Sequence, residues 1–134
     1  MTNDISRLPR VPVSPGELID KITILDLKAE RMTDRGKVDN VRRERAILQA
    51  ERDAHLPDDA AVRDLTDRLR SANGRLWDLE DAIRDCERRK DFGPAFIEAA
   101  RAIYRTNDER AALKKAINLH FGSLIVEEKS YAAY

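Results

Sequence analysis

Apolar residues recur at alternating steps of three and four between positions 58 and 90, and this is the most regular pattern in the chain. The stripe consists of Val62, Leu65, Leu69, Ala72, Leu76, Leu79, Ile83 and Cys86. This spacing keeps one face of an α-helix apolar. Asn73-Gly74 resembles a turn, but the stripe has the same phase on both sides of it. We therefore predict one helix over 58–90, with Gly74 on its outer face at a cost of about 1 kcal/mol.

A second apolar stripe follows a break at Asp91-Phe92-Gly93-Pro94, where Pro94 suits the first position of a new helix. The stripe consists of Phe92, Phe96, Ala99, Ile103, Thr106, Arg110, Leu113, Ile117 and His120. Gly122 suits the end of this helix. Because only a short break separates the two stripes, we expect an antiparallel hairpin that turns near residue 92. In that register Arg110 lies level with Gly74.

The N-terminal half of the chain contains two further helix patterns. Ser14-Pro15, followed by Glu17, is a capping box with a proline at the first helical position. The stripe that follows consists of Leu18, Ile22, Leu25, Ala29 and Met32. A thinner apolar stripe predicts another helix over 37–55, with one packed side and one charged side.

Both ends of the chain lack a helix pattern. Residues 1–13 contain two prolines and are expected to form an extended arm, and residues 123–134 form a C-terminal tail. Val11-Pro12-Val13 and Leu124-Ile125-Val126 are apolar runs that could pair as short strands, although the proline weakens one of them. We predict a single all-α domain over 1–134. It is an elongated antiparallel bundle of about four helices, built on the long hairpin, with short extended arms at both ends.

Composition narrows the class of protein further. The chain has 134 residues, and 37% of them are charged, but 25 Lys and Arg balance 25 Asp and Glu. A net charge of zero argues against nucleic-acid binding. The polar start and the absence of a long apolar run argue against a signal peptide and a membrane span. Cys86 is the only cysteine, so no intrachain disulfide is expected. We therefore expect a cytoplasmic protein.

The predicted dimensions bear on self-association. A helix over 58–90 is about 50 Å long, whereas a compact domain of this size is roughly 36 Å across. Helices of this length cannot cover one another fully in one chain. We therefore expect a homo-oligomer, most simply a dimer.

Two polar residues, Thr106 and Arg110, interrupt the apolar stripe of the last predicted helix. A charged group inside such a stripe must be paired. The hairpin register offers Asp78 as a partner for Arg110, and the helix that begins at Pro15 offers Glu17 or Asp20. A structural interpretation stands beside this one: Thr106-x-x-Glu109 is itself a capping box, so the helix could break there, and polar layers also fix the register of bundles.

If this block is functional, its residues form an anion-binding group. Arg105, Asn107, Arg110 and Lys114 would contact the ligand, and Asp108 would orient them. The hairpin register places Trp77 level with Asn107, and Tyr104 lies at the start of the block. No cofactor is expected. The two histidines, His55 and His120, have no ligand partner at helical spacing, so no metal site is predicted.

Three segments resemble a family of small uncharacterised bacterial proteins. The first is Val11-Pro12-Val13-Ser14-Pro15-Gly16-Glu17-Leu18-Ile19-Asp20-Lys21-Ile22-Thr23-Ile24-Leu25, and the second is Leu76-Trp77-Asp78-Leu79-Glu80-Asp81. The third begins with Tyr104-Arg105-Thr106-Asn107-Asp108 and continues through Arg110-Ala111-Ala112 to Lys114. The resemblance implies a stand-alone bacterial domain and brings no known reaction with it.

Two hypotheses for function follow. The first is a non-enzymatic interaction or scaffold protein that self-associates through its helical faces. The second is a small enzyme or binding protein for an anionic metabolite that uses the patch from Arg105 to Lys114. The two differ in whether the block from Tyr104 to Arg110 is a closed polar layer or an open cleft.

Overall fold

A computed structural model describes residues 4–134 and contains four α-helices, as predicted. They are α1 (Pro15–Arg31), α2 (Arg35–His55), α3 (Ala60–Arg88) and α4 (Pro94–His120), and a short 3-10 helix, η1 (Ile5–Arg7), precedes them. No strand occurs within this part of the chain, so the predicted pairing of residues 11–13 with residues 124–126 is wrong. None of the described helices is both long enough and apolar enough to cross a bilayer.

The helices begin where the sequence provides a cap. Ser14 Oγ accepts a hydrogen bond from Glu17 N at 3.1 Å, and Pro15 occupies the first position of α1. Asp34 caps α2 in the same way, which starts this helix two residues earlier than predicted. At the end of α4, Gly122 adopts a φ of 61°, the left-handed conformation that favours glycine at helix ends.

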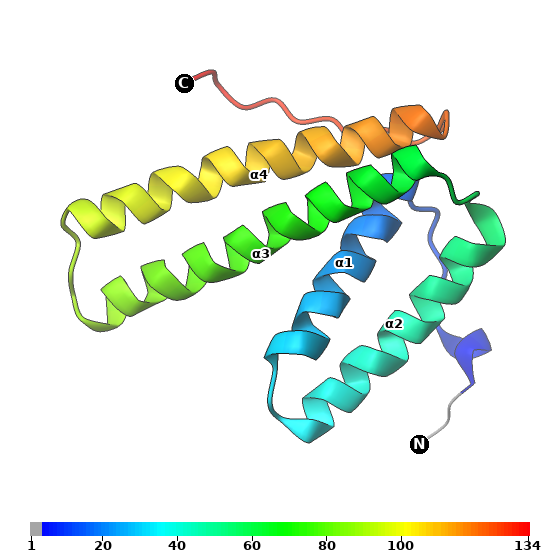
Figure 1. The fold of residues 1–134 in the computed structure, drawn as a ribbon, viewed down its shortest axis with the longest axis horizontal. Helices are drawn as coiled ribbons and strands as arrows, with labels where there is room; N and C mark the ends of the chain where they lie inside the picture. The colour runs from blue at the N-terminus through cyan, green and yellow to red at the C-terminus, as the bar shows by residue number, and fades with distance from the viewer. Residues whose placement is uncertain (1–3) are drawn as a thin grey trace.

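The helices form three layers, with α1 in the middle (Figure 1). α3 and α4 form the antiparallel hairpin, α1 crosses it, and α2 packs against α1 rather than against the hairpin. Because α1 is covered from both sides, eight of its residues are buried, whereas α2 buries only Val41. The thin apolar stripe of α2 therefore matches its position as an outer helix.

The main core lies where the first half of α1 meets the hairpin. Ile19 of α1 packs there with residues of α3 and α4, namely Val62, Leu69, Ala72, Leu113 and Ile117. The register of the hairpin is the predicted one, because Arg75 of α3 donates two hydrogen bonds to Glu109 of α4 at 3.0 and 2.8 Å.

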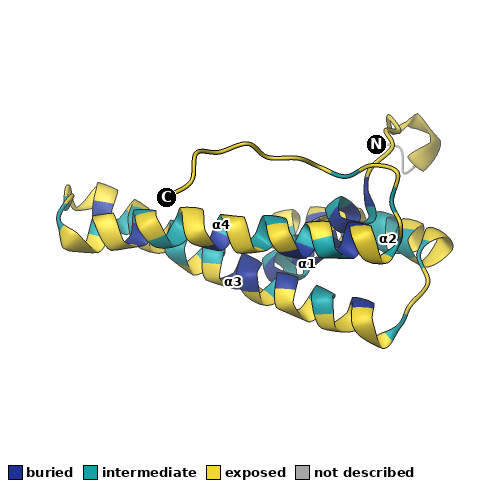
Figure 2. Cartoon of the chain, turned by 90° about the horizontal axis from the view of Figure 1, so that it is seen from above, coloured by how far each residue is buried: buried dark blue, intermediate teal, exposed yellow. Residues whose placement is uncertain are grey.

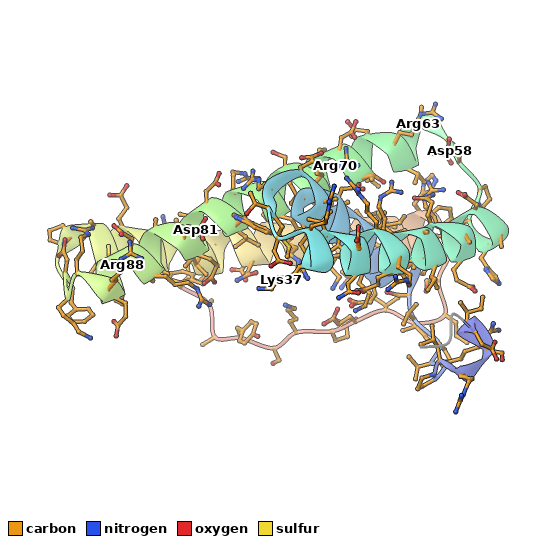
Figure 3. All side chains as sticks on the ribbon, turned by 90° about the horizontal axis from the view of Figure 1, so that it is seen from below. Lys37, Asp58, Arg63, Arg70, Asp81 and Arg88 are labelled. Atoms are coloured by element: carbon orange, nitrogen blue, oxygen red, sulfur yellow. The ribbon has the colours of Figure 1, made fainter. Side chains whose placement is uncertain are left out.

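The hairpin extends beyond the other two helices (Figures 1 and 2). Between residues 75 and 105 only Cys86 and Ala99 are buried. Asp81 and Arg88 lie on the part of α3 that α1 and α2 leave uncovered (Figure 3). This part of the hairpin therefore has little buried core of its own.

Two expectations about the hairpin are wrong. Gly74 is buried rather than on the outer face, because α1 crosses α3 at this point: an added Cβ would lie 3.5 Å from Arg31 Nη2 and 3.9 Å from Leu27 Cδ2. α4 also does not break at Thr106. This side chain is buried in a continuous helix from Pro94 to His120.

Candidate functional site

A partly buried polar cluster joins α1 to the hairpin, and it consists of Glu17, Asp20, Asn73, Arg110 and Lys114. Its centre is Asp20, whose side chain is 1% exposed. Asp20 accepts hydrogen bonds from Arg110 Nε at 3.0 Å and Arg110 Nη2 at 2.5 Å, and a third from Asn73 Nδ2 at 2.9 Å. The prediction that Arg110 pairs with an acid of the first helix is therefore confirmed.

The alternative prediction, that Arg110 pairs with Asp78, is wrong. Asp78 instead accepts a hydrogen bond from Arg31 Nη1 at 2.8 Å, near the C-terminal end of α1. The reason is the crossing of α1 over the hairpin, which brings Asp20 between Arg110 and Asn73 and brings Arg31 to Asp78.

Lys114 is the second cation of the cluster, and its side chain is only 12% exposed. Its ammonium donates to Glu17 Oε2 at 2.6 Å and to Glu127 Oε2 of the tail at 3.2 Å, and lies 3.9 Å from Asp20 Oδ2. Burial of the ammonium lowers the pKa of Lys114, but the three carboxylates outweigh it, so that the pKa is raised above its ordinary value. Lys114 is therefore held in its charged form.

The guanidinium of Arg110 behaves in the same way. Its hydrogen bonds to Asp20 raise its pKa and outweigh the opposing effect of burial, with smaller contributions from Glu17 and Glu127. A bidentate pair of this kind has a fixed geometry as well as a favourable energy. It therefore sets the position of Asp20 along the hairpin.

Helical spacing explains how the cluster forms. Arg110, Lys114 and Asn118 lie four residues apart and share one face of α4. Asn118 is buried and accepts a hydrogen bond from Gly16 N at 2.7 Å, at the start of α1. On the α3 side, Asn73 Nδ2 donates a second hydrogen bond to Thr23 Oγ1 at 3.0 Å. Polar faces of three helices thus meet inside the bundle.

The sequence did not reveal the roles of Asn73, Thr23 and Asn118. Asn73 was interpreted as part of a turn-like pair, and the other two lie next to apolar stripe residues without belonging to a charged motif. The available signal was their phase: Thr23 follows Ile22, and Asn118 follows Ile117, so both fall at the border of an apolar face. Glu127 was likewise missed, because the position of the tail does not follow from helical periodicity.

The remaining predicted site residues do not join this cluster. Trp77 lies beside Arg31, whose guanidinium carbon is 5.7 Å from the indole centroid. Tyr104 packs edge-on against Tyr134 of the tail, with ring centroids 5.0 Å apart, and Tyr134 Oη donates to Asp108 at 2.7 Å. This hydrogen bond raises the pKa of Tyr134. Asn107 is half-buried on α4.

Arg105 faces a different surface, a hollow of about 780 Å³ that it lines with Arg75, Arg101 and Thr106. Nine of the ten predicted residues therefore occupy four separate places, which are the cluster, the end of α1, the tail contact and this hollow, and Asn107 belongs to none of them. Within residues 4–134 no three His, Cys, Asp or Glu side chains come together in a way that could hold a metal ion.

The charged groups of the polar cluster are paired with one another. Each of its two cations contacts carboxylates of α1, and Asp20 has almost no access to solvent. An external anion would therefore have to displace Glu17 or Asp20 from the cations. What the arrangement does chemically is to fix the position of α1 across α3 and α4, since satisfied buried polar groups specify one packing.

Comparison with known proteins gives a family but no activity. No curated protein and no solved structure shows significant similarity to the chain. The sequence model of one family, described as a family of unknown function (DUF6165), matches residues 9–134. This match includes all four helices and every residue of the polar cluster. The chain therefore belongs to the DUF6165 family of unknown function.

Proposed function

We propose that the protein is a non-enzymatic interaction or scaffold protein that self-associates as a homodimer. The supporting observation is its surface. The accessible area is 9293 Å² for a 15.3 kDa chain, whereas a compact monomer of this mass exposes about 7,150 Å². The excess is about 2,100 Å², which is more than each partner contributes to a standard interface, about 800 Å².

The internal pairing of the polar cluster supports the same proposal. The groups with the chemistry for catalysis or ligand binding, Asp20, Arg110 and Lys114, are engaged with one another. The surface excess comes from the overhanging hairpin and from the extended terminal segments (Figures 1 and 2). Such surfaces suit contact with another macromolecule better than they suit enclosure of a small substrate.

The proposal is tested by measuring the mass of the purified protein. Size-exclusion chromatography with light scattering is run over a wide range of protein concentrations. We expect a species of twice the 15.3 kDa chain mass that dissociates on dilution. A 15.3 kDa species at the highest attainable concentration would overturn the proposal.

A second candidate function is binding of an anionic metabolite beside Arg105. Arg75 is held by Glu109, but Arg101 and Arg105, which line the same hollow, form no ion pair with a described residue. Two unpaired guanidinium groups one turn apart suit a carboxylate or a phosphate.

This candidate is separated from the first by a thermal-shift titration with inorganic phosphate and citrate. The first proposal predicts no change in Tm with either anion beyond that of a matched salt control. A rise in Tm that Arg105→Ala abolishes would favour the second candidate. Arg63→Ala, at an exposed arginine on α3, is the matched control and should leave the rise unchanged.

A further inference from the structure

The arm and the tail leave the bundle at the same end, and that end carries most of the exposed large apolar side chains. The hydrogen bond between Gly16 N and Asn118 shows that the start of α1 adjoins the end of α4. Nine of the twelve exposed large apolar or aromatic residues lie in these segments or beside them, and two of the nine, Tyr131 and Tyr134, lie further along the tail. The other seven are Ile5, Leu8, Val11, Val13, Leu119, Leu124 and Ile125. The opposite end, at the hairpin turn, exposes fewer.

The tail presents a short ordered projection, which we name the knob and define as residues 123–126. It is fixed on one side by the end of α4 at Gly122 and on the other by Glu127, which accepts from Lys114 at 3.2 Å. Ser123 Oγ accepts a hydrogen bond from Ile125 N at 3.1 Å and so holds the turn between them. At its tip, Leu124 is 100% exposed. A leucine held in this way is ordered without any apolar contact in its own chain.

A complementary surface lies on the other side of α1, and we name it the arm groove. The N-terminal arm forms one wall with Ile5, Leu8 and Val13, and α1 and α2 form the other with Leu18, Ile47, Leu48 and Leu56. The groove has a volume of about 530 Å³. Its lining is mainly apolar, and its charged residues are Arg10, Lys21 and Glu51. The knob of the same chain does not fill it, because Leu124 is fully exposed.

We propose that the knob of one chain inserts into the arm groove of a second copy, and that the second copy does the same in return. The proposal rests on the self-association proposed above and names its surface. A two-fold dimer with two such contacts is closed, because knob and groove lie at the same end of each chain. Charge favours this pairing. Glu127 and Glu128 directly follow the knob, and although they contact Lys114 and Lys115 they remain 53% and 74% exposed. On the groove side, two cations, Arg10 and Lys21, outnumber one carboxylate, Glu51.

Two substitutions test the two halves of the contact. Leu124→Asp changes the knob and Leu8→Asp changes the groove, and both positions are exposed and lie outside the α-helices. We expect each variant to raise the dimer Kd at least tenfold without a change in its circular dichroism. At concentrations where the wild type and the variant are both monomeric, their Tm values should be equal. Ile97→Asp, at an exposed position near the hairpin turn, is the matched control and should leave the Kd unchanged.

Mixing the variants gives a sharper test. A pair of one Leu124→Asp chain and one Leu8→Asp chain retains one intact contact, because the knob of the second fits the groove of the first. The mixture should therefore contain more dimer than either variant alone. Dimers that survive both single substitutions but dissociate with Ile97→Asp would overturn the knob inference and keep the self-association. A wild-type monomer at all concentrations would overturn both.

Discussion

Asp20 is the residue on which the position of α1 depends. Its carboxylate is almost fully buried and accepts hydrogen bonds from Arg110 of α4 and Asn73 of α3. A buried carboxylate that loses its cation is strongly unfavourable. The pair is therefore a constraint that holds only when the three helices are correctly placed.

Replacing Arg110 by alanine is expected to lower the free energy of unfolding by about 3 kcal/mol. The value lies at the lower end of the range for broken buried pairs because Arg110 is 30% exposed and Lys114 remains 3.9 Å from Asp20. Urea unfolding followed by circular dichroism measures the change. Arg105→Ala, at an exposed position of the same helix, is the control and should change stability by less than about 0.5 kcal/mol. Equal stability of the two variants would contradict a structural role for the cluster.

The sequence indicated this cluster only in part. Arg110 in an apolar stripe required a partner, and the acids of the first helix were named as candidates. The choice between Asp20 and Asp78 depends on the angle at which α1 crosses the hairpin, and no periodicity within one helix encodes that angle. The same limit explains Glu127, whose contact with Lys114 depends on the path of the tail.

α1 packs against both helices of the hairpin, and two glycines show how close it comes to α4 and to α3. Gly16 of α1 lies against α4: an added Cβ would be 2.4 Å from the backbone oxygen of Lys114. Gly74 of α3 also faces α1, but a Cβ added there would lie at ordinary contact distances, 3.5 Å from Arg31 Nη2 and 3.9 Å from Leu27 Cδ2. Only the first contact requires a glycine.

The two glycines should therefore respond in opposite ways to alanine. Gly16→Ala forces the backbones of α1 and α4 apart and should cost at least about 2 kcal/mol. Gly74→Ala has room for its methyl group and improves helix propensity, so it should stabilise the protein by up to about 1 kcal/mol. Thermal and urea unfolding of both variants checks this pair. If Gly74→Ala lost as much stability as Gly16→Ala, the inference that only Gly74 has room for a methyl group would be wrong.

Helix starts were predictable because they are local. Ser14-Pro15 and Pro94 mark α1 and α4 by the hydrogen-bonding needs of the first turn, whatever the rest of the chain does. The place of Gly74 was not predictable in this way. The heptad pattern shows which face of α3 is apolar, but it contains no information about where along α3 another helix crosses or which further residues that helix covers.

The whole molecule is a hairpin with one end packed and the other uncovered. The sequence predicted the hairpin, its register and an elongated shape, since these follow from helix length and turn position. It did not predict that α2 packs on α1 instead of on the hairpin. As a result, α1 is the only other helix that contacts the hairpin in the described residues. The uncovered part of the hairpin and the terminal segments supply the surface on which the proposed dimer depends.

The central position of α1 also has a consequence for how the chain is made. Asp20 and Arg110 are 90 residues apart in the sequence, and Gly16 and Asn118 are 102 apart. At typical rates of synthesis, roughly 5–20 residues per second, α1 leaves the ribosome about 5–20 s before these partners. During that time α2 and then α3 become available to pack against α1, but the face of α1 that meets α4 has no partner. The nascent chain therefore exposes the face of α1 that meets α4, with Asp20 still without its cation Arg110, and the bundle is complete only after α4 has been synthesised.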